Sequence, residues 1–187
     1  MNMITIRRER RTDQAAREQL LDAAYGRVRF SKPSHKLREG RDPADGLSFV
    51  AVEDGRVVGT VRLWPVTAGA GRQVLLLGPL AVDPAHRNRG IGSALMRRAM
   101  RDAQRGHQAV LLVGDASYYG RFGFSAEKTA RLWLPGPYEQ HRLLGCEFVS
   151  GALDGARGLI RAPRRPASKL APLVAAMTRR RAAPQAA

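Results

Sequence analysis

The sequence predicts an α/β (α+β) domain built around a mixed β-sheet. Segments with the apolar runs or alternation of β-strands occur before, between and after two segments with the apolar spacing of α-helices. An Asp-Gly turn joins two of the predicted strands as a hairpin, and a glycine-containing loop leads from a later strand into the second helix. A length of 187 residues suits one domain with a substantial core and short appendages.

The first predicted elements are a strand, a helix and a long polar loop. Residues 4–6 form the strand, Thr12 and Asp13 supply an N-cap, and residues 14–27 carry apolar side chains at helical spacing. Residues 31–46 are polar and contain proline and glycine, which indicates a loop with room for a short helix.

Three strands are predicted next. Residues 47–52 and 57–64 form a hairpin, and residues 73–82 form the third strand. Gly78 and Pro79 interrupt that strand, and a proline cannot donate a hydrogen bond to a neighbouring strand. The pair therefore predicts a β-bulge or an edge position.

The second half of the chain begins with a helix and a buried strand. Residues 90–105 have an amphipathic pattern, and Gly106 is placed to cap the end of the helix. Residues 109–113 are continuously apolar, which is typical of a strand buried on both faces. Three shorter elements follow, namely one or two helical turns at 117–121 and strands at 131–134 and 146–149.

The composition is strongly basic, with a formal net charge of +16. Eight basic residues and no acidic residue lie from Arg157 onward. We therefore divide the chain into a domain at residues 1–160 and a basic, flexible tail at residues 161–187, in which residues 170–177 have the pattern of a short helix. Such a surface attracts polyanions, nucleic acid among them.

Several protein classes are disfavoured. Cys146 is the single cysteine, so neither an intrachain disulfide nor a cysteine-based metal cluster is expected, and we interpret it as a small buried residue rather than a nucleophile. No metal site is predicted. The longest apolar runs are far too short to span a membrane, and residues 1–7 lack the apolar core of a signal peptide. We therefore expect a cytoplasmic protein without membrane contact.

The clearest functional pattern lies at residues 80–93, where a strand, a loop and a helix start follow one another. The loop contains Arg87-x-x-Gly90-x-Gly92. The first turn of a helix has N–H groups without partners and the positive end of the helix dipole, and glycine lets an anion approach the backbone. The pattern favours a pyrophosphate site, although it is neither a Gly-x-Gly-x-x-Gly fingerprint nor a Walker A loop. A plain glycine-containing helix start is the alternative.

This segment resembles the coenzyme-A-binding motif of the GNAT superfamily, the Gcn5-related N-acetyltransferases, which reads Arg/Gln-x-x-Gly-x-Gly/Ala after a bulged strand. A second GNAT signature, Asn/Asp-x-x-x-Tyr-x-x-x-Gly-Phe, is similar to residues 114–124, with Asp115, Tyr119, Gly123 and Phe124 at the matching positions. The double tyrosine and the Arg-Phe-Gly-Phe ending resemble the YhbS-type branch of these acetyltransferases. The resemblance covers residues 47–160 and implies the GNAT fold, a mixed and mostly antiparallel sheet that is splayed at the acetyl-CoA site and flanked by helices.

The resemblance also implies the residues that bind acetyl-CoA. Backbone N–H groups of the strand before the loop face the thioester and the pantetheine amides, while the loop and the helix start hold the diphosphate. The implied residues are Leu80, Ala81, Val82, Arg87, Asn88, Arg89, Gly90, Ile91, Gly92, Ser93 and Asp115.

Tyr119 takes the position of the general acid that protonates the leaving thiolate, and a phenol with a pKa of about 10 suits that proton transfer. Ordinary core packing of Tyr119 is the alternative, and Tyr118 is a competitor for the role. Asp115 either positions the pantetheine arm or caps the helical turns after it. No general base stands out, because Glu53 and His86 are candidates by residue type only.

Together these features predict an enzyme that transfers an acetyl group from acetyl-CoA to an amine by direct attack, through a tetrahedral intermediate, as a monomer or homodimer. The sequence does not identify the acceptor. The alternative is a nucleic-acid- or ribosome-associated binding protein on a GNAT-like scaffold, which the net charge and the basic tail favour. The tail has no aromatic residues, which argues against a stacking platform for bases.

Overall fold

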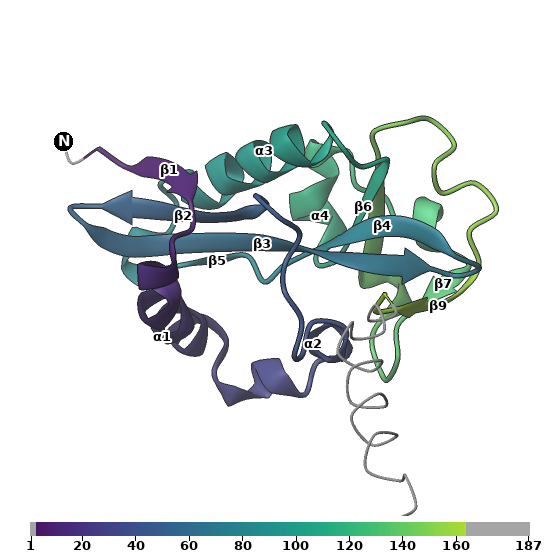
Figure 1. Ribbon diagram of the computed structural model, residues 1–187, viewed down its shortest axis with the longest axis horizontal. Helices are drawn as coiled ribbons and strands as arrows, with labels where there is room; N and C mark the ends of the chain where they lie inside the picture. The colour runs from purple at the N-terminus through teal and green to yellow at the C-terminus, as the bar shows by residue number, and fades with distance from the viewer. Residues whose placement is uncertain (1–2, 164–187) are drawn as a thin grey trace, which may run out of the picture.

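The computed structural model describes residues 3–163, which form nine strands in one sheet with helices on both faces (Figure 1). The strands are β1 (Thr5–Arg8), β2 (Ser48–Glu53), β3 (Arg56–Ala68), β4 (Arg72–Leu77), β5 (Ala81–Val82), β6 (Ala109–Val113), β7 (Leu132–Trp133), β8 (Leu143–Glu147) and β9 (Gly158–Arg161). The α-helices are α1 (Gln14–Tyr25), α2 (Pro33–Lys36), α3 (Ile91–Ala103) and α4 (Ala116–Tyr119). The 3₁₀ turns are η1 (Arg11–Asp13), η2 (Arg27–Phe30), η3 (Pro84–His86), η4 (Gly120–Phe122), η5 (Glu127–Thr129) and η6 (Gln140–Arg142).

The sheet is mixed and mostly antiparallel, as the sequence predicted. Its main path runs β1-β2-β3-β4-β6-β8, with β5 and β9 on β3 and with β7 on β9. Only the pairs β4–β6 and β7–β9 are parallel among the described strands. The long strand β3 therefore organises the sheet, because four other strands pair with it directly.

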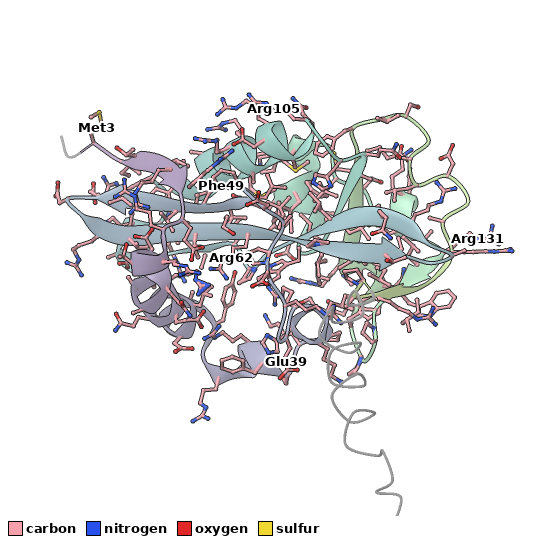
Figure 2. The ribbon with its side chains drawn as sticks, viewed as in Figure 1. Met3, Glu39, Phe49, Arg62, Arg105 and Arg131 are labelled. Atoms are coloured by element: carbon pink, nitrogen blue, oxygen red, sulfur yellow. The ribbon has the colours of Figure 1, made fainter. Side chains whose placement is uncertain are left out.

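Helix α3 covers one face of the sheet, while α1 and α2 cover the other (Figure 1). Period-two alternation explains how β3 serves both layers: Val61 and Leu63 join the cluster under α3, and Trp64 and Val66 join the second cluster. Figure 2 shows Phe49 on the α3 side of the sheet and Arg62 on the α1 side. Residues 74–77 of β4 and the strand β6 are likewise covered on both faces, which accounts for their continuously apolar sequences.

The predicted third strand is divided at Gly78-Pro79 by a β-bulge. Leu63 of β3 faces Leu77, but Thr60 of β3 faces Ala81. Two β3 residues therefore oppose three residues of the broken strand, which is the register shift of a bulge. The prediction of a bulge from the Gly-Pro pair is confirmed.

The bulge separates the strand from its other neighbour. β4 pairs with β6 through Leu75 and Leu76, whereas β5, after the bulge, pairs with β3 alone among the described strands. The sheet is consequently splayed between β5 and the end of β6. The broken strand, the start of α3 and the cavity described below border this opening.

Some elements differ from the sequence-based expectation. β3 extends to Ala68 through Pro65, and β8 begins at Leu143, three residues before the predicted strand. β9 was not predicted, because its four residues lie where basic composition suggested a tail; it pairs with the extended end of β3 at Thr67 and Ala68. The remaining tail and its predicted helix at 170–177 lie outside the described residues. No helix in residues 3–163 is long and apolar enough to cross a membrane.

Candidate functional site

The splayed strand presents backbone donors to the opening. The N–H of Asp83 donates to the carbonyl oxygen of Val58 on β3 at 2.9 Å. Since hydrogen-bonded and non-bonded residues alternate along an antiparallel pair, Ala81 is the next residue bonded to β3, and the N–H groups of Leu80 and Val82 point away from it. Of the three donors that the sequence predicted, the alternation thus directs Leu80 and Val82 into the opening and Ala81 toward β3.

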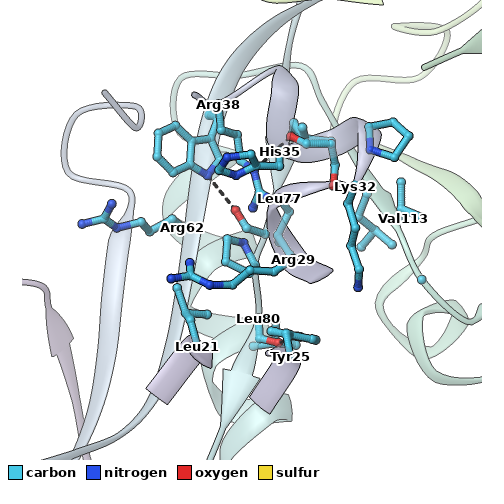
Figure 3. Close-up of a pocket in the computed structure, with 18 of the residues that line it drawn as sticks. Leu21, Tyr25, Arg29, Lys32, His35, Arg38, Arg62, Leu77, Leu80 and Val113 are labelled. Carbon is cyan, nitrogen blue, oxygen red and sulfur yellow. Dashed lines mark hydrogen bonds between the residues drawn. The ribbon is translucent and has the colours of Figure 1, made fainter. Parts of the chain in front are cut away.

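Two carbonyl groups of the broken strand are already engaged. The indole Nε1 of Trp64 donates to the carbonyl oxygen of Gly78 at 2.6 Å (Figure 3), and the hydroxyl of Tyr25 donates to the carbonyl oxygen of Leu80. These bonds hold the broken strand from the α1 side. The polar groups left open at the splay are therefore mainly donors, which suits a ligand with carbonyl oxygens.

The start of α3 lies beyond β5. Asn88 and Gly90 have φ angles of 61° and 74°, a left-handed conformation that asparagine and glycine tolerate best. The first helical hydrogen bond runs from the N–H of Ala94 to the carbonyl of Gly90 at 3.0 Å. The N–H groups of residues 91–93 consequently have no helical partner and carry the positive end of the helix dipole.

Gly92 lies where this helix start meets two other parts of the site. A Cβ atom at this position would lie 3.0 Å from the hydroxyl oxygen of Tyr118 and 3.7 Å from Cγ2 of Val82. The close approach explains why glycine suits this position. It also places the Tyr118 hydroxyl beside the helix start rather than at the cavity described below.

The two arginines of the loop make different contacts. Arg87 is exposed, and within residues 3–163 it makes no ion pair. Arg89 instead binds Glu53 through two hydrogen bonds of 2.6 and 3.1 Å, which hold the pKa of that carboxyl below its usual range. Glu53 also contacts Nε2 of His86 at 2.8 Å. These two candidate bases thus engage each other, and neither lines the cavity.

A cavity of ≈ 770 Å³ opens on the α1–α2 face of the splay (Figure 3). Its walls come from the broken strand at Leu77–Leu80, the end of β6, and the segment from α1 through α2. The alternating β3 residues Thr60, Arg62 and Trp64 form its floor. The volume is in the range of small-molecule sites.

Tyr119 lines this cavity. Its ring packs so closely on the backbone of β6 that a Cβ atom at Gly114 would lie 2.1 Å from its Cε2 atom. Burial, together with the nearby Tyr25, raises the pKa of the Tyr119 phenol, so the phenol keeps its proton at neutral pH. The ring also contacts the aromatic rings of Tyr118 and Phe124, so part of the side chain packs in the core, while its predicted role as the general acid stays a prediction.

Asp115 occupies the N-cap position of α4, yet its side chain makes no capping bond. Its backbone oxygen accepts the N–H of Tyr119 at 2.9 Å, and its carboxylate accepts a hydrogen bond from Arg142 at 2.7 Å. Asp115 therefore places the start of α4 through its backbone and holds Arg142 at the cavity through its side chain. Cys146 is buried, burial raises the pKa of its thiol, and the interpretation as a small core residue is confirmed.

Sequence reasoning missed the side chains that form the α1–α2 wall. Tyr25, Arg38 and Arg142 line the cavity, but they come from a helix, a polar loop and a 3₁₀ turn that carry no recognisable motif. No local signal in the sequence distinguishes them from other tyrosines and arginines. They become visible only when the fold brings them to the splay.

Comparison with known proteins agrees with this geometry. Residues 44–126 match the family model described as Acetyltransferase (GNAT) domain. The N-acetyltransferase YhbS of Escherichia coli (strain K12) is 35% identical over 138 residues, which cover 70% of this chain and 78% of that protein. The chain belongs to the GNAT family of acetyltransferases. The family and the YhbS-type likeness expected from the two motifs are thereby confirmed.

Two solved GNAT structures share the fold over most of their length. The crystal structure of YhbS from Escherichia coli in complex with CoA has a TM-score of 0.74 at 29% identity, covering 87% of this chain and 91% of that one. A GNAT acetyltransferase from Brucella melitensis in complex with acetyl-CoA has a TM-score of 0.66 at 30% identity, covering 87% of this chain and 97% of that one.

The basic tail of this GNAT chain is described only in part. Arg157 and Arg161 belong to the described residues, whereas the other basic residues of the tail, Arg164, Arg165, Lys169, Arg179, Arg180 and Arg181, lie outside them. The predicted contact with nucleic acid or the ribosome therefore stays a prediction.

Proposed function

We propose that this GNAT chain transfers the acetyl group of acetyl-CoA to an amine that binds in the cavity. The observation that carries the proposal is the splay, where the outward N–H groups of Leu80 and Val82 lie between an anion-binding helix start and a cavity lined by Tyr119. A thioester drawn along this strand would connect the two. The CoA and acetyl-CoA in the two solved GNAT structures support the same donor.

The helix start is suited to the diphosphate of the donor. Three unpartnered N–H groups of residues 91–93 converge there, and Ser93 adds a hydroxyl donor. Arg87 is free of protein carboxylates in the described structure and can form a charge-assisted contact. Arg89 reaches the same loop, but its hydrogen bonds to Glu53 have to loosen before it can contribute fully.

The splay is suited to the transfer itself. The neutral amine attacks the thioester carbonyl carbon, a C–N bond forms, and negative charge develops on the carbonyl oxygen, which the free backbone N–H groups stabilise. When the C–S bond breaks, the departing thiolate takes the proton of Tyr119. The amine nitrogen loses one proton to solvent, from which Tyr119 is protonated again, so the products are an N-acetyl compound and CoA thiol.

The protonation of Tyr119 agrees with this role. The raised pKa keeps the phenol protonated before the reaction, although it also makes the phenol a weaker acid. The thiolate leaves into the same poorly solvated region, where its own affinity for a proton is raised by the same cause. The gap between the proton affinities of the phenol and the thiolate is therefore smaller than the raised pKa of Tyr119 alone implies.

The proposal is tested by thiol release from acetyl-CoA in the presence of a panel of amines, with CoA binding measured separately by calorimetry. We expect CoA to bind and at least one amine to stimulate thiol release. A chain that binds no CoA, or that releases thiol without forming an N-acetyl product by mass spectrometry, would contradict the proposal.

A further inference from the structure

Arg38 is a cation that the acetyl-transfer chemistry does not use. It follows α2, is partly buried, and lines the cavity. Its Nε donates to the carbonyl of Ser34 at 3.0 Å, and within residues 3–163 no carboxylate forms an ion pair with it. Burial, with a smaller effect of the nearby Arg29, lowers the pKa of Arg38 to about 10, so the group is still charged at neutral pH.

The other arginines of the cavity differ from Arg38, because each holds a carboxylate of the protein itself. The pairs are Arg17 with Glu18 at 3.0 Å, Arg29 with Glu18 at 2.6 Å, Arg62 with Glu9 at 2.7 Å, and Arg142 with Asp115 at 2.7 Å. A guanidinium that is partly removed from water without a counter-ion costs free energy. Among the arginines of the cavity in the described structure, the arrangement therefore leaves the Arg38 guanidinium available to an anion from outside.

Arg38 lies next to the splay. A Cβ atom at Gly78 would be 3.9 Å from its Nη1 atom, and Gly78 is two residues before the outward N–H of Leu80. Figure 3 shows Arg38 with Arg29 and Lys32 around the cavity. An anion bound by Arg38 would therefore be only a few atoms away from the reacting amine.

A second polar group of the cavity lacks a partner. Thr60 is 1% exposed, and its hydroxyl makes no hydrogen bond within the described residues. It lies on the cavity floor, opposite Ala81 of the broken strand. Buried hydroxyls are normally paired, so this one also indicates a polar ligand.

We propose that the acceptor is a small amino carboxylate, such as a free amino acid, whose carboxylate is bound by Arg38 while its amine lies at the splay. This inference rests on the proposed acetyl transfer and narrows its acceptor. The cavity of ≈ 770 Å³ has room for such a molecule beside the thioester. Lys32, which lines the same cavity, adds positive charge toward the anion.

Binding of the carboxylate to Arg38 also prepares the amine for attack. In a free amino acid the carboxylate stabilises the neighbouring ammonium, which cannot attack the thioester. When Arg38 neutralises that carboxylate, the ammonium loses this stabilisation, and its pKa moves toward the value of about 8 of an isolated α-amino group. A carboxylate base is then unnecessary, which agrees with the engagement of Glu53 and His86 elsewhere. A diamine would instead place its second cation near Arg38 and Lys32.

The test compares acceptors that differ only in the carboxylate, namely phenylalanine with phenethylamine, tyrosine with tyramine, and lysine with cadaverine. Thiol release from acetyl-CoA is measured with the native chain and with Arg38→Gln, Arg38→Lys and Lys36→Gln. Lys36→Gln removes one charge from an exposed residue of α2 that does not line the cavity. Thermal unfolding of each variant controls for folding.

We expect kcat/KM to favour the carboxylate members by about tenfold or more, as for a charged hydrogen bond. Arg38→Gln should abolish this preference by lowering kcat/KM for the carboxylate members, without lowering it for the amines that lack a carboxylate. Arg38→Lys should restore part of the preference, and Lys36→Gln should leave it unchanged. A native preference for the amines without a carboxylate, or an equal loss for both members of each pair with Arg38→Gln, would overturn the inference.

A binding measurement separates this inference from the proposed function. N-acetyltyrosine and N-acetyltyrosinamide are titrated calorimetrically into the chain, with and without CoA. Tighter binding of the carboxylate that disappears with Arg38→Gln supports the inference even where no acceptor turns over, and equal binding of the two compounds overturns it. If CoA itself does not bind, the proposed acetyl transfer is contradicted. The two N-acetyl compounds can still be compared on the chain without CoA, so the inference about Arg38 is tested separately.

Discussion

The two sides of the splay are built from different kinds of groups. Along the broken strand and at the start of α3, the polar groups that face the opening belong mainly to the backbone, at Leu80, Val82 and residues 91–93. On the α1–α2 side they are side chains: Tyr25 and Trp64 donate to carbonyl groups of the broken strand, and Arg38 lies beside Gly78. In the proposed function these two sides have different tasks: the backbone N–H groups would bind acetyl-CoA, and the side chains would select the acceptor.

Tyr119 stands between the two sides, and its substitution should have the largest effect. Tyr119→Phe keeps the ring that packs on Gly114 but removes the proton, so kcat should fall by about 10²-fold while the Kd for CoA stays within about twofold. Steady-state kinetics and calorimetry measure the two quantities. Tyr118→Phe is the matched control, because its hydroxyl lies beside Gly92 instead of the cavity. An equal fall in kcat for both variants would remove the distinction between the two tyrosines.

On the α3 side, the two arginines of the loop should contribute unequally. Arg87→Ala should weaken CoA binding about tenfold, since a charge-assisted contact to the diphosphate is lost, and the loss should shrink at high salt. Arg89→Ala should weaken it less, because Arg89 is held by Glu53. Calorimetry at two salt concentrations measures both, and Arg97→Ala, an exposed arginine further along α3, serves as the control. A larger effect at Arg89 would mean that its ion pair with Glu53 opens when CoA binds.

The contrast between backbone groups and side chains at the splay also explains how much of the molecule could be predicted from the sequence. The bulge and the glycine loop follow from short stretches of sequence, because backbone geometry at a strand break or a helix start depends on nearby glycines and prolines. Tyr119 was singled out by the resemblance of residues 114–124 to a GNAT signature. The hydrogen bond from Tyr25 to the carbonyl of Leu80 joins residues 55 positions apart, so no local pattern encodes it.

β9 was missed for the same reason that the α1–α2 wall was missed. Its four residues form a strand because β3 extends beyond the predicted hairpin and offers Thr67 and Ala68 as partners, while β7 pairs along the other edge. Composition around Arg157 is basic and suggested a tail. Where structure depends on pairing between distant segments, the local sequence was a poor guide.

Acid should destabilise the ion pair between Arg7 and Asp13 at the start of α1, on the α1–α2 side of the splay. Arg7 donates hydrogen bonds of 2.6 and 2.8 Å to Asp13 just before α1, and they lower the pKa of Asp13 to about 2. Because this value lies below the unfolded value of about 3.9, the stabilisation is complete above pH 4 and is lost as the pH falls toward 2. After allowing for solvent screening, we expect about 1 kcal/mol.

Denaturant unfolding of the native chain and of Asp13→Asn checks this expectation. The difference in free energy of unfolding between them should be about 1 kcal/mol at pH 6 and should narrow toward pH 2.5. Asp54→Asn, in the exposed turn between β2 and β3, is the comparison variant. A gap between native chain and Asp13→Asn that stays constant with pH would show that the Arg7–Asp13 pair contributes nothing through its charge.

The smallest effect is expected at Trp64, a cavity side chain that binds the backbone of the broken strand. Trp64→Phe removes the 2.6 Å hydrogen bond to the carbonyl of Gly78 while keeping an aromatic ring in the buried cluster. Loss of one such bond costs about 1 kcal/mol. If that bond holds the bulge in place, part of the cost should fall on transfer, lowering kcat/KM for acetyl-CoA about threefold. Trp133→Phe, at a side chain that is 50% exposed, should change neither stability nor transfer. Trp64→Phe could instead lose stability but transfer acetyl groups at the native rate. That result would show that the N–H groups of Leu80 and Val82 keep their positions without the Trp64 hydrogen bond, and that the cavity side chains do not position the broken strand.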